Sequence, residues 1–263
     1  MMRQLFYLLI TACSILSTGI ASAKESAEAH TLKVVSYNIR HGEGMDDKID
    51  LKRIADHISQ TSPDLVVLQE VDKNCTRSGN QDLAKELGGL LKMDHRFGKF
   101  MDLQGGEYGM AVLSRLPIKE TIAHPLPKGA EPRCALEVKV ELDGLSVPVS
   151  LLCIHNDWTN EKIRTKQVTA LMKALKNYSN PIILAGDFNG QRSDNSIKLL
   201  EEDEWQILDK GGKKTFPSYK PRVEIDFIMV KNLKLVEVVH DVLDEPVVSD
   251  HKAIYTTMTF QPE

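Results

Sequence analysis

Hydrophobic and polar positions alternate along the chain and predict strands and helices that follow one another from Leu32 to about Phe260. The clearest strand covers 134–142, where apolar residues at every second position predict one buried and one solvent-facing side. Continuous apolar runs at 66–68 and 182–184 favour strands covered on both faces. The expected strands are 32–39, 64–69, 95–101, 109–114, 134–142, 146–154, 181–186, 223–230, 233–240 and 252–260.

Helices are expected at four places, namely 50–60, 80–91, 161–177 and 195–202. The third carries a row of basic side chains, which we interpret as an ordinary solvated face. Asp143-Gly144 between two expected strands predicts a hairpin. Many strands, several adjacent in sequence, and few helices predict an α/β fold of two packed sheets flanked by helices.

Length and composition fit one large domain over residues 32–263, because 263 residues with 42% hydrophobic content can bury one substantial core. The formal net charge of −4 argues against general affinity for nucleic acid. A local basic patch stays open as an alternative, and its candidates are the helix at 161–176 and the cluster from Lys210 to Lys214.

The first 23 residues have the pattern of an export signal, with Arg3 before an apolar run and Ala21-Ser22-Ala23 as the cleavage site. We therefore expect a periplasmic or secreted protein, with 24–31 as a linker. Lipoprotein processing at Cys13 is the less favoured alternative. After cleavage Cys75, Cys134 and Cys153 remain, so at most one disulfide forms, and Cys75 with Cys134 is the candidate pair. Cys153 is expected to be a buried thiol.

Polar residues follow the apolar runs at several expected strand ends. Glu70 and Asp250 supply carboxylates and Asn38 a neutral amide, which are ligand types that Mg²⁺ accepts. Asp187 and Asn189 lie between glycines in a tight strand exit, where an aspartate suits water activation and an amide suits a phosphate oxygen. Taken alone, each has a structural explanation, such as a solvated strand end or an Asx turn.

Two histidines at strand ends, His155 and His251, are the natural donors to a phosphate whose charge grows in the transition state. A carboxylate partner would hold such a ring and raise its pKa, and Asp226 is the candidate partner of His251.

Taken in order, these segments resemble the endonuclease/exonuclease/phosphatase superfamily, the deoxyribonuclease I-like group. The resemblance covers about residues 32–260 and rests on Ser36-Tyr37-Asn38-Ile39-Arg40, Leu68-Gln69-Glu70-Val71, Tyr108-Gly109 to Leu113-Ser114-Arg115, His155-x-Asp157, Gly186-Asp187-Phe188-Asn189, Ile225-Asp226 and Ser249-Asp250-His251.

The resemblance implies a four-layer α/β/β/α sandwich of two mostly antiparallel sheets, and cleavage of phosphate esters with Mg²⁺ or Mn²⁺. It implies that Glu70 is the main metal ligand, with Asn38 and Asp250 nearby, and that Asp187 activates water. The other implied catalytic or phosphate-binding residues are Asn38, Arg133, His155, Asn189, Asp226 and His251.

The chain departs from the family pattern at two positions, because Met110 replaces a frequent Asn and Asn156 follows His155 in place of Leu. The carboxylate partner of His155 is not evident, and Glu107 is our candidate. Arg77 is expected to contact the substrate anion, since it precedes a helix whose N-terminus could receive a phosphate.

We expect an exported, Mg²⁺-dependent phosphodiesterase or phosphatase that acts as a monomer on a small or lipid-linked phosphate ester, and that contacts membranes only through a lipid substrate. A secreted non-specific nuclease is the alternative, although the acidic charge disfavours nucleic acid. A non-catalytic binding module on the same fold is a third hypothesis, and the complete set of candidate catalytic residues argues against it.

Overall fold

The computed structural model of the protein describes residues 29–260, so the expected signal, Cys13 and most of the expected linker lie outside the described residues. The strands are β1 His30–Asn38, β2 Leu65–Lys73, β3 Asp94–Leu103, β4 Gly106–Ser114, β5 Ile118–Leu126, β6 Arg133–Val140, β7 Val149–His155, β8 Ile182–Asp187, β9 Gln206–Ile207, β10 Asp226–Lys231, β11 Leu235–Val242 and β12 Ile254–Phe260. The α-helices are α1 Leu51–Ser59, α2 Leu83–Leu91, α3 Glu161–Leu175 and α4 Asn195–Glu202, and 3₁₀ turns cover Arg40–Gly42 (η1) and Thr76–Ser78 (η2).

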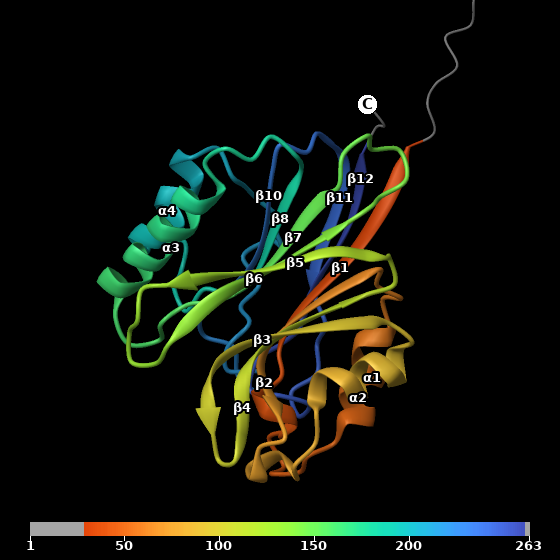
Figure 1. The fold of residues 1–263 in the computed structure, drawn as a ribbon, viewed down its shortest axis with the longest axis vertical. Coiled ribbons are helices and arrows are strands. Elements are labelled where there is room, and N and C mark those ends of the chain that lie inside the picture. Colours follow the sequence, from red (N-terminus) through yellow and green to blue (C-terminus); the bar gives the residue numbers. More distant parts are fainter. Residues whose placement is uncertain (1–28, 261–263) are drawn as a thin grey trace, which may run out of the picture.

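The strands form two six-stranded sheets, in the orders β11-β12-β1-β2-β4-β3 and β5-β6-β7-β8-β10-β9. Each sheet contains one parallel pair, β1 with β2 and β7 with β8, and its other pairs are antiparallel. The helices α1 and α2 cover the outer face of the first sheet, and α3 and α4 cover that of the second (Figure 1). The four-layer sandwich expected from the sequence is confirmed.

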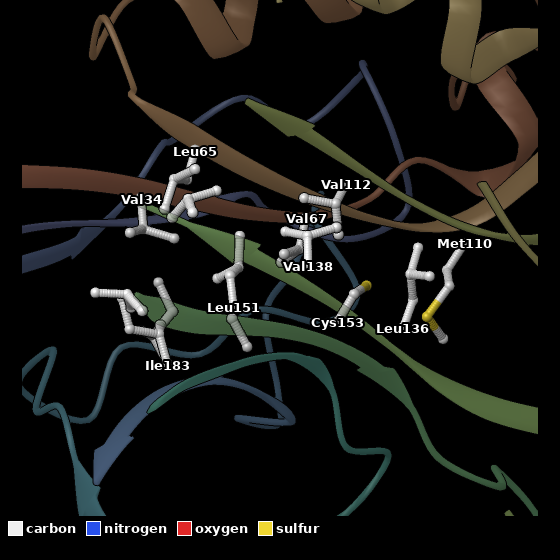
Figure 2. Close-up of a cluster of buried hydrophobic side chains, with 14 of the residues drawn as sticks. Val34, Leu65, Val67, Met110, Val112, Leu136, Val138, Leu151, Cys153 and Ile183 are labelled. Carbon is white, nitrogen blue, oxygen red and sulfur yellow. The ribbon is translucent and has the colours of Figure 1, made fainter. Parts of the chain in front are cut away.

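The central core lies between the two sheets. Val67 and Val112 of the first sheet face Val138 and Leu151 of the second, and all four are fully buried (Figure 2). Each outer layer has its own apolar cluster between sheet and helices. Side chains on both faces of the central strands are therefore covered, as the continuous apolar runs predict.

Two strands escape prediction, and both lie at an edge of the second sheet. In β5 most side chains are exposed and Pro125 interrupts the pattern, which an edge position tolerates. The strand β9 has two residues. The predicted hairpin is confirmed, since β6 and β7 are antiparallel neighbours and Gly144 has φ of 85°.

The prediction that one side of β6 faces solvent is wrong at Glu137, because this side chain is fully buried. Its carboxylate accepts hydrogen bonds from Ser150 Oγ at 2.6 Å and Tyr178 Oη at 3.1 Å, and it lies 2.6 Å from His124 Nε2. Alternation within one strand cannot show that residues distant in sequence cover its outer face.

Cysteine pairing is absent from the described part of the chain: Cys75, Cys134 and Cys153 are free and buried. The buried thiol expected at Cys153 is confirmed. Within residues 29–260, no helix combines the length and the apolar character that crossing a membrane requires.

Buried histidines make the fold sensitive to acid. Burial lowers the pKa of His240 to about 4, while its Nδ1 lies 2.8 Å from the carbonyl oxygen of Tyr255. In the unfolded chain His240 takes up a proton near pH 6.5, whereas in the folded chain it stays neutral. The folded state therefore has its full stability above that pH and loses part of it as the pH falls toward 4. We expect His240 to account for a loss of about 2 kcal/mol between pH 7 and pH 5.

The measurement is urea unfolding at both pH values for the wild type and for His240→Asn, whose amide can still donate to the Tyr255 carbonyl. The variant should lose less stability than the wild type over this interval. Equal losses would show that His240 does not contribute to the acid sensitivity.

Candidate active site

The polar residues at strand ends gather at one edge of the two sheets. Asn38 ends β1, and His251 lies just before the start of β12, the antiparallel neighbour of β1. In the second sheet His155 and Asp226 are both register partners of Asp187. Sheet topology therefore brings together residues from both halves of the chain.

Asn38 joins the two sheets through hydrogen bonds. Its Nδ2 donates to Glu70 Oε1 at 3.0 Å and to Asp187 Oδ2 at 3.1 Å, and its Oδ1 accepts from the backbone N–H of Arg40. The backbone oxygen of Asn38 accepts a hydrogen bond from Ser249 Oγ at 2.7 Å. Asn38 thus holds two carboxylates in place, and its direct contact with metal or phosphate stays a prediction.

Glu70 sits at a β-bulge. Its φ is 57°, and the pairing of β2 with β4 shifts register between Gln69 and Val71. A bulge redirects a side chain that regular pairing would aim elsewhere. The carboxylate is half-buried at the sheet edge, so backbone strain is concentrated at the residue expected to bind metal.

Asp187 is the centre of the site. Gly186 before it has φ of 154°, and a Cβ there would lie 1.9 Å from the carbonyl oxygen of Ile154, so this tight exit requires glycine. Asp187 Oδ1 accepts from the backbone N–H of Asn189 at 2.8 Å. Burial raises the pKa of Asp187 to about 7, in spite of the opposing charge of His251. Such a carboxylate is suited to accept a proton near neutral pH.

His251 lies between two carboxylates. Its Nδ1 is 3.1 Å from Asp226 Oδ2, as the sequence predicts, and its Nε2 is 3.6 Å from Asp187 Oδ2. Burial alone would lower the pKa of His251, but Asp226 and Asp187 together raise it to about 10. Ligand atoms of these three residues lie within 4.8 Å of one another, a spacing that could hold a metal ion. The contact of Nδ1 with Asp226 also suits an imidazole that a carboxylate holds in place.

His155 has a different environment. Its Nε2 is 3.5 Å from Asp187 Oδ2, and its buried Nδ1 has no hydrogen-bond partner among the described residues. Burial, together with the charges of Arg133 and His251, holds the pKa of His155 well below its ordinary value. His155 is therefore a neutral group, and only His251 is cationic.

Glu107 is not the partner of His155, so that expectation is wrong. Its carboxylate lies 3.2 Å from Lys73 Nζ and 3.0 Å from Lys99 Nζ. Glu107 belongs to a surface network that ties β2, β3 and β4 together.

Glu70 and Asp250 are carboxylates without a cationic partner. Both line the same cavity, and within residues 29–260 neither makes an ion pair with lysine, arginine or histidine. Asp250 Oδ1 lies 3.3 Å from Ser249 Oγ, whose hydrogen is donated at shorter distance to the backbone oxygen of Asn38. Uncompensated oxygen donors facing one cavity fit a hard divalent cation.

Arg133 provides buried positive charge in the wall of the same cavity. Its side chain is 2% exposed, and its guanidinium lies 4.8 Å from the centre of the Phe100 ring and 6.0 Å from that of Tyr108. Nη1 is 2.7 Å from Glu131, but Nε has no hydrogen-bond partner among the described residues. A buried guanidinium with free donor capacity suits a phosphate oxygen.

Arg77 lines the cavity but is already engaged. Its Nε and Nη2 both donate to the buried carboxylate of Asp72 at 2.8 Å. It lies in η2, and the next helix, α2, has its N-terminus capped by Asp82, which accepts from Lys85 N. The expectation that this helix receives a phosphate is wrong because a carboxylate takes that place.

Most candidate site residues line one cavity of about 350 Å³, whereas Asn38 and Asp226 are not part of its lining. Three aromatic residues in its wall were not predicted from the sequence: Tyr108, Trp158 and Phe216. Trp158 follows the His155-x-Asp157 motif directly and is 64% exposed, which marks it as a residue at the mouth. The full lining is Glu70, Arg77, Met101, Leu103, Tyr108, Glu131, Arg133, His155, Trp158, Asp187, Asn189, Phe216, Asp250 and His251.

Lys210 stabilises the segment that carries Asp226. Its fully buried ammonium donates to Glu224 at 2.6 Å and to the backbone oxygen of Asp226 at 3.0 Å. Lys210→Met leaves the Glu224 carboxylate without this partner, so we expect a loss of about 3 kcal/mol in the free energy of unfolding, measured with urea.

Lys213→Met is the matched control, because Lys213 pairs with Asp241 at an exposed position. Its loss should stay below about 1 kcal/mol. Equal losses in the two variants would contradict a special role for the buried pair.

Comparisons with known proteins agree with this geometry. The model of the endonuclease/exonuclease/phosphatase family matches residues 35–251. A conserved protein of unknown function from Enterococcus faecalis shares the fold with a TM-score of 0.73 and 19% identity, covering 88% of this chain and 100% of that one. A mannosyl-6-phosphatase from Bacteroides thetaiotaomicron has a TM-score of 0.68 and 18% identity, covering 87% and 100%.

A truncated TDP2 from Caenorhabditis elegans has a TM-score of 0.67 and 19% identity, covering 87% of this chain and 97% of that one. At such identities the solved structures establish the fold alone. A comparison with curated proteins finds no match.

Proposed function

The chain belongs to the endonuclease/exonuclease/phosphatase family, and from this premise we propose that it is a divalent-metal-dependent phosphoesterase that hydrolyses its substrate with water. The proposal rests on the three nitrogen atoms that surround Asp187 Oδ2. Asn38 Nδ2, His155 Nε2 and His251 Nε2 lie 3.1, 3.5 and 3.6 Å from it, and they come from both sheets.

In the proposed reaction Asp187 accepts a proton from the attacking water. Its raised pKa suits this role, and His251, steadied by Asp226, supplies positive charge beside the developing negative charge. We propose that His155 and Arg133, which line the same cavity, contact the oxygens of the phosphate.

Asn189 has a φ of 49°, and its Nδ2 donates to the backbone oxygen of Asn156 at 3.1 Å. The second hydrogen of this amide is available for the phosphate.

Glu70 and Asp250 would hold Mg²⁺ or Mn²⁺, with Asn38 positioning Glu70. Such an ion, when bound, offsets the negative charge of the phosphate group. The unpaired carboxylates of Glu70 and Asp250 support this assignment.

A small or lipid-linked phosphate ester is the proposed substrate class, and the protein is proposed to be exported and to act as a monomer. A bounded cavity of about 350 Å³ supports a small reacting group over a long polymer. The basic cluster at Lys210–Lys214 does not support a nuclease, because Lys210 is buried against Glu224 and Lys213 pairs with Asp241.

A substrate panel with Mg²⁺ and with Mn²⁺ tests the proposal. It should contain bis(4-nitrophenyl) phosphate, a hexose 6-phosphate, sphingomyelin, phosphatidylinositol, inositol phosphates, plasmid DNA and RNA. We expect chelator-sensitive hydrolysis of at least one small or lipid-linked ester. Cleavage confined to DNA or RNA would favour the nuclease, and tight metal binding without turnover on any member would favour a binding module.

A further inference from the structure

A second cavity of about 440 Å³ adjoins the candidate active site. It shares two residues with the catalytic cavity, Phe216 and Asp250. We call it the side groove, and its lining is Arg40, Met45, Phe216, Pro217, Tyr219, Arg222, Val223 and Asp250. The two cavities therefore lie next to each other, with Phe216 and Asp250 at their junction.

The segment that builds the groove, residues 215–223, is anchored to the catalytic segment. The backbone N–H of Ser218 donates to the Asp250 carbonyl at 2.6 Å, and Ser218 Oγ donates to the Ser249 carbonyl at 2.6 Å. The Phe216 ring lies 4.8 Å from the His251 ring. Phe216 thus lies beside His251 at the junction of the two cavities.

The groove combines apolar surface with one free cation. Tyr219 is 61% exposed and Met45 36% exposed. Arg40 already donates to the Gly44 carbonyl and lies 3.3 Å from Glu43. Arg222 is exposed, and no side-chain hydrogen bond or ion pair engages its guanidinium within residues 29–260.

We propose that the side groove binds the organic group of the substrate, and that this group is aromatic or otherwise apolar and carries an anionic substituent. The inference rests on the proposed phosphoesterase function. The apolar part would pack on Tyr219 and Phe216, and the anion would pair with Arg222. The two residues shared with the catalytic cavity favour part of the substrate over a membrane surface as the occupant.

Unreactive phosphonates test this without turnover. Methylphosphonate, biphenyl-4-ylphosphonate and 4′-carboxybiphenyl-4-ylphosphonate are titrated into the protein with excess Mg²⁺ by calorimetry. We expect the biphenyl group to strengthen binding by about fivefold, the size of one aromatic contact, and the carboxylate to add a further gain of about fivefold.

Two variants separate the contributions. Tyr219→Ala should remove the gain from the biphenyl group, and Arg222→Gln should remove only the gain from the carboxylate. Lys220→Gln is the matched control, because Lys220 is exposed in the same segment but does not line the groove. It should bind all three phosphonates like the wild type.

Each contrary outcome has a distinct meaning. If methylphosphonate does not bind the wild type, the proposed phosphate site fails. If it binds and the biphenyl group adds nothing, or the gains survive in both variants, the side groove is not a substrate site. Co-sedimentation with phosphatidylglycerol vesicles that Tyr219→Ala abolishes, with phosphonate affinities unchanged, would assign the groove to a lipid surface and overturn the proposal.

Discussion

Asp187→Asn should lower kcat by about 10³-fold or more while leaving the fold intact. The amide has the size of the carboxylate, and its single oxygen can still accept from Asn189 N–H, although the Asn38 Nδ2 hydrogen bond to the second oxygen is lost. It cannot accept a proton from water, and it removes one of the two carboxylates that keep His251 charged. Both effects act on the same step, so the loss should appear in kcat more than in KM.

The measurement is steady-state hydrolysis of whichever ester the panel identifies, with thermal unfolding as the check on folding. Asp82→Asn is the control, because Asp82 caps α2 and asparagine serves equally well as a helix cap. The control should retain wild-type kcat. A kcat for Asp187→Asn within tenfold of wild type would remove Asp187 from the role of base.

The sequence could predict the site because each polar residue follows an apolar run and strand ends share an edge. Periodicity located β1, β2, β7 and β8, and the two parallel pairs among them then place Asn38, Glu70, His155 and Asp187 at that edge. Asp226 begins β10 and His251 lies just before β12, and both strands are antiparallel to their neighbours β8 and β1, so these residues reach the same edge at the start of a strand.

Contacts between distant segments could not be predicted in this way. The bulge at Glu70 is a property of the pairing of β2 with β4, and the burial of Lys210 depends on Glu224. The same holds for Arg77, whose charge is taken up by Asp72. A basic residue near a motif has the same sequence signature whether it is paired inside the protein or free for substrate.

Pairing also divides the acidic residues of the cavity into two kinds. Glu131 lies beside Arg133, and Asp187 lies beside His251, so each of these carboxylates has a cationic neighbour within the protein. Within residues 29–260, Glu70 and Asp250 make no ion pair of this kind, and a bound cation would supply the positive charge. This difference predicts that replacing Glu70 affects the stability of the protein in opposite directions with and without bound metal.

Glu70→Gln should raise the Mg²⁺ concentration for half-maximal activity by more than about 100-fold, since outer-shell changes alone cost roughly 10- to 100-fold in metal affinity. Gln keeps an oxygen for the hydrogen bond from Asn38 and removes only the charge. At a Mg²⁺ concentration about 100 times the wild-type Kd, the ion stabilises the wild type by about 3 kcal/mol, and this gain should nearly vanish in the variant. Without Mg²⁺ the variant should be as stable as the wild type or more stable, because one of two unpaired carboxylates is gone.

Thermal unfolding across a Mg²⁺ titration measures the change in stability both with and without Mg²⁺, and it does not depend on turnover. Glu131→Gln is the matched control, because its carboxylate lines the same cavity but is already balanced by Arg133. The control should keep the wild-type Mg²⁺ dependence of the Tm. If Glu70→Gln also keeps it, Glu70 is not a metal ligand. If the variant is instead less stable than the wild type in the absence of Mg²⁺, the carboxylate of Glu70 has a structural role through Asn38, and the unpaired charges are not the reason for the site's affinity for cations.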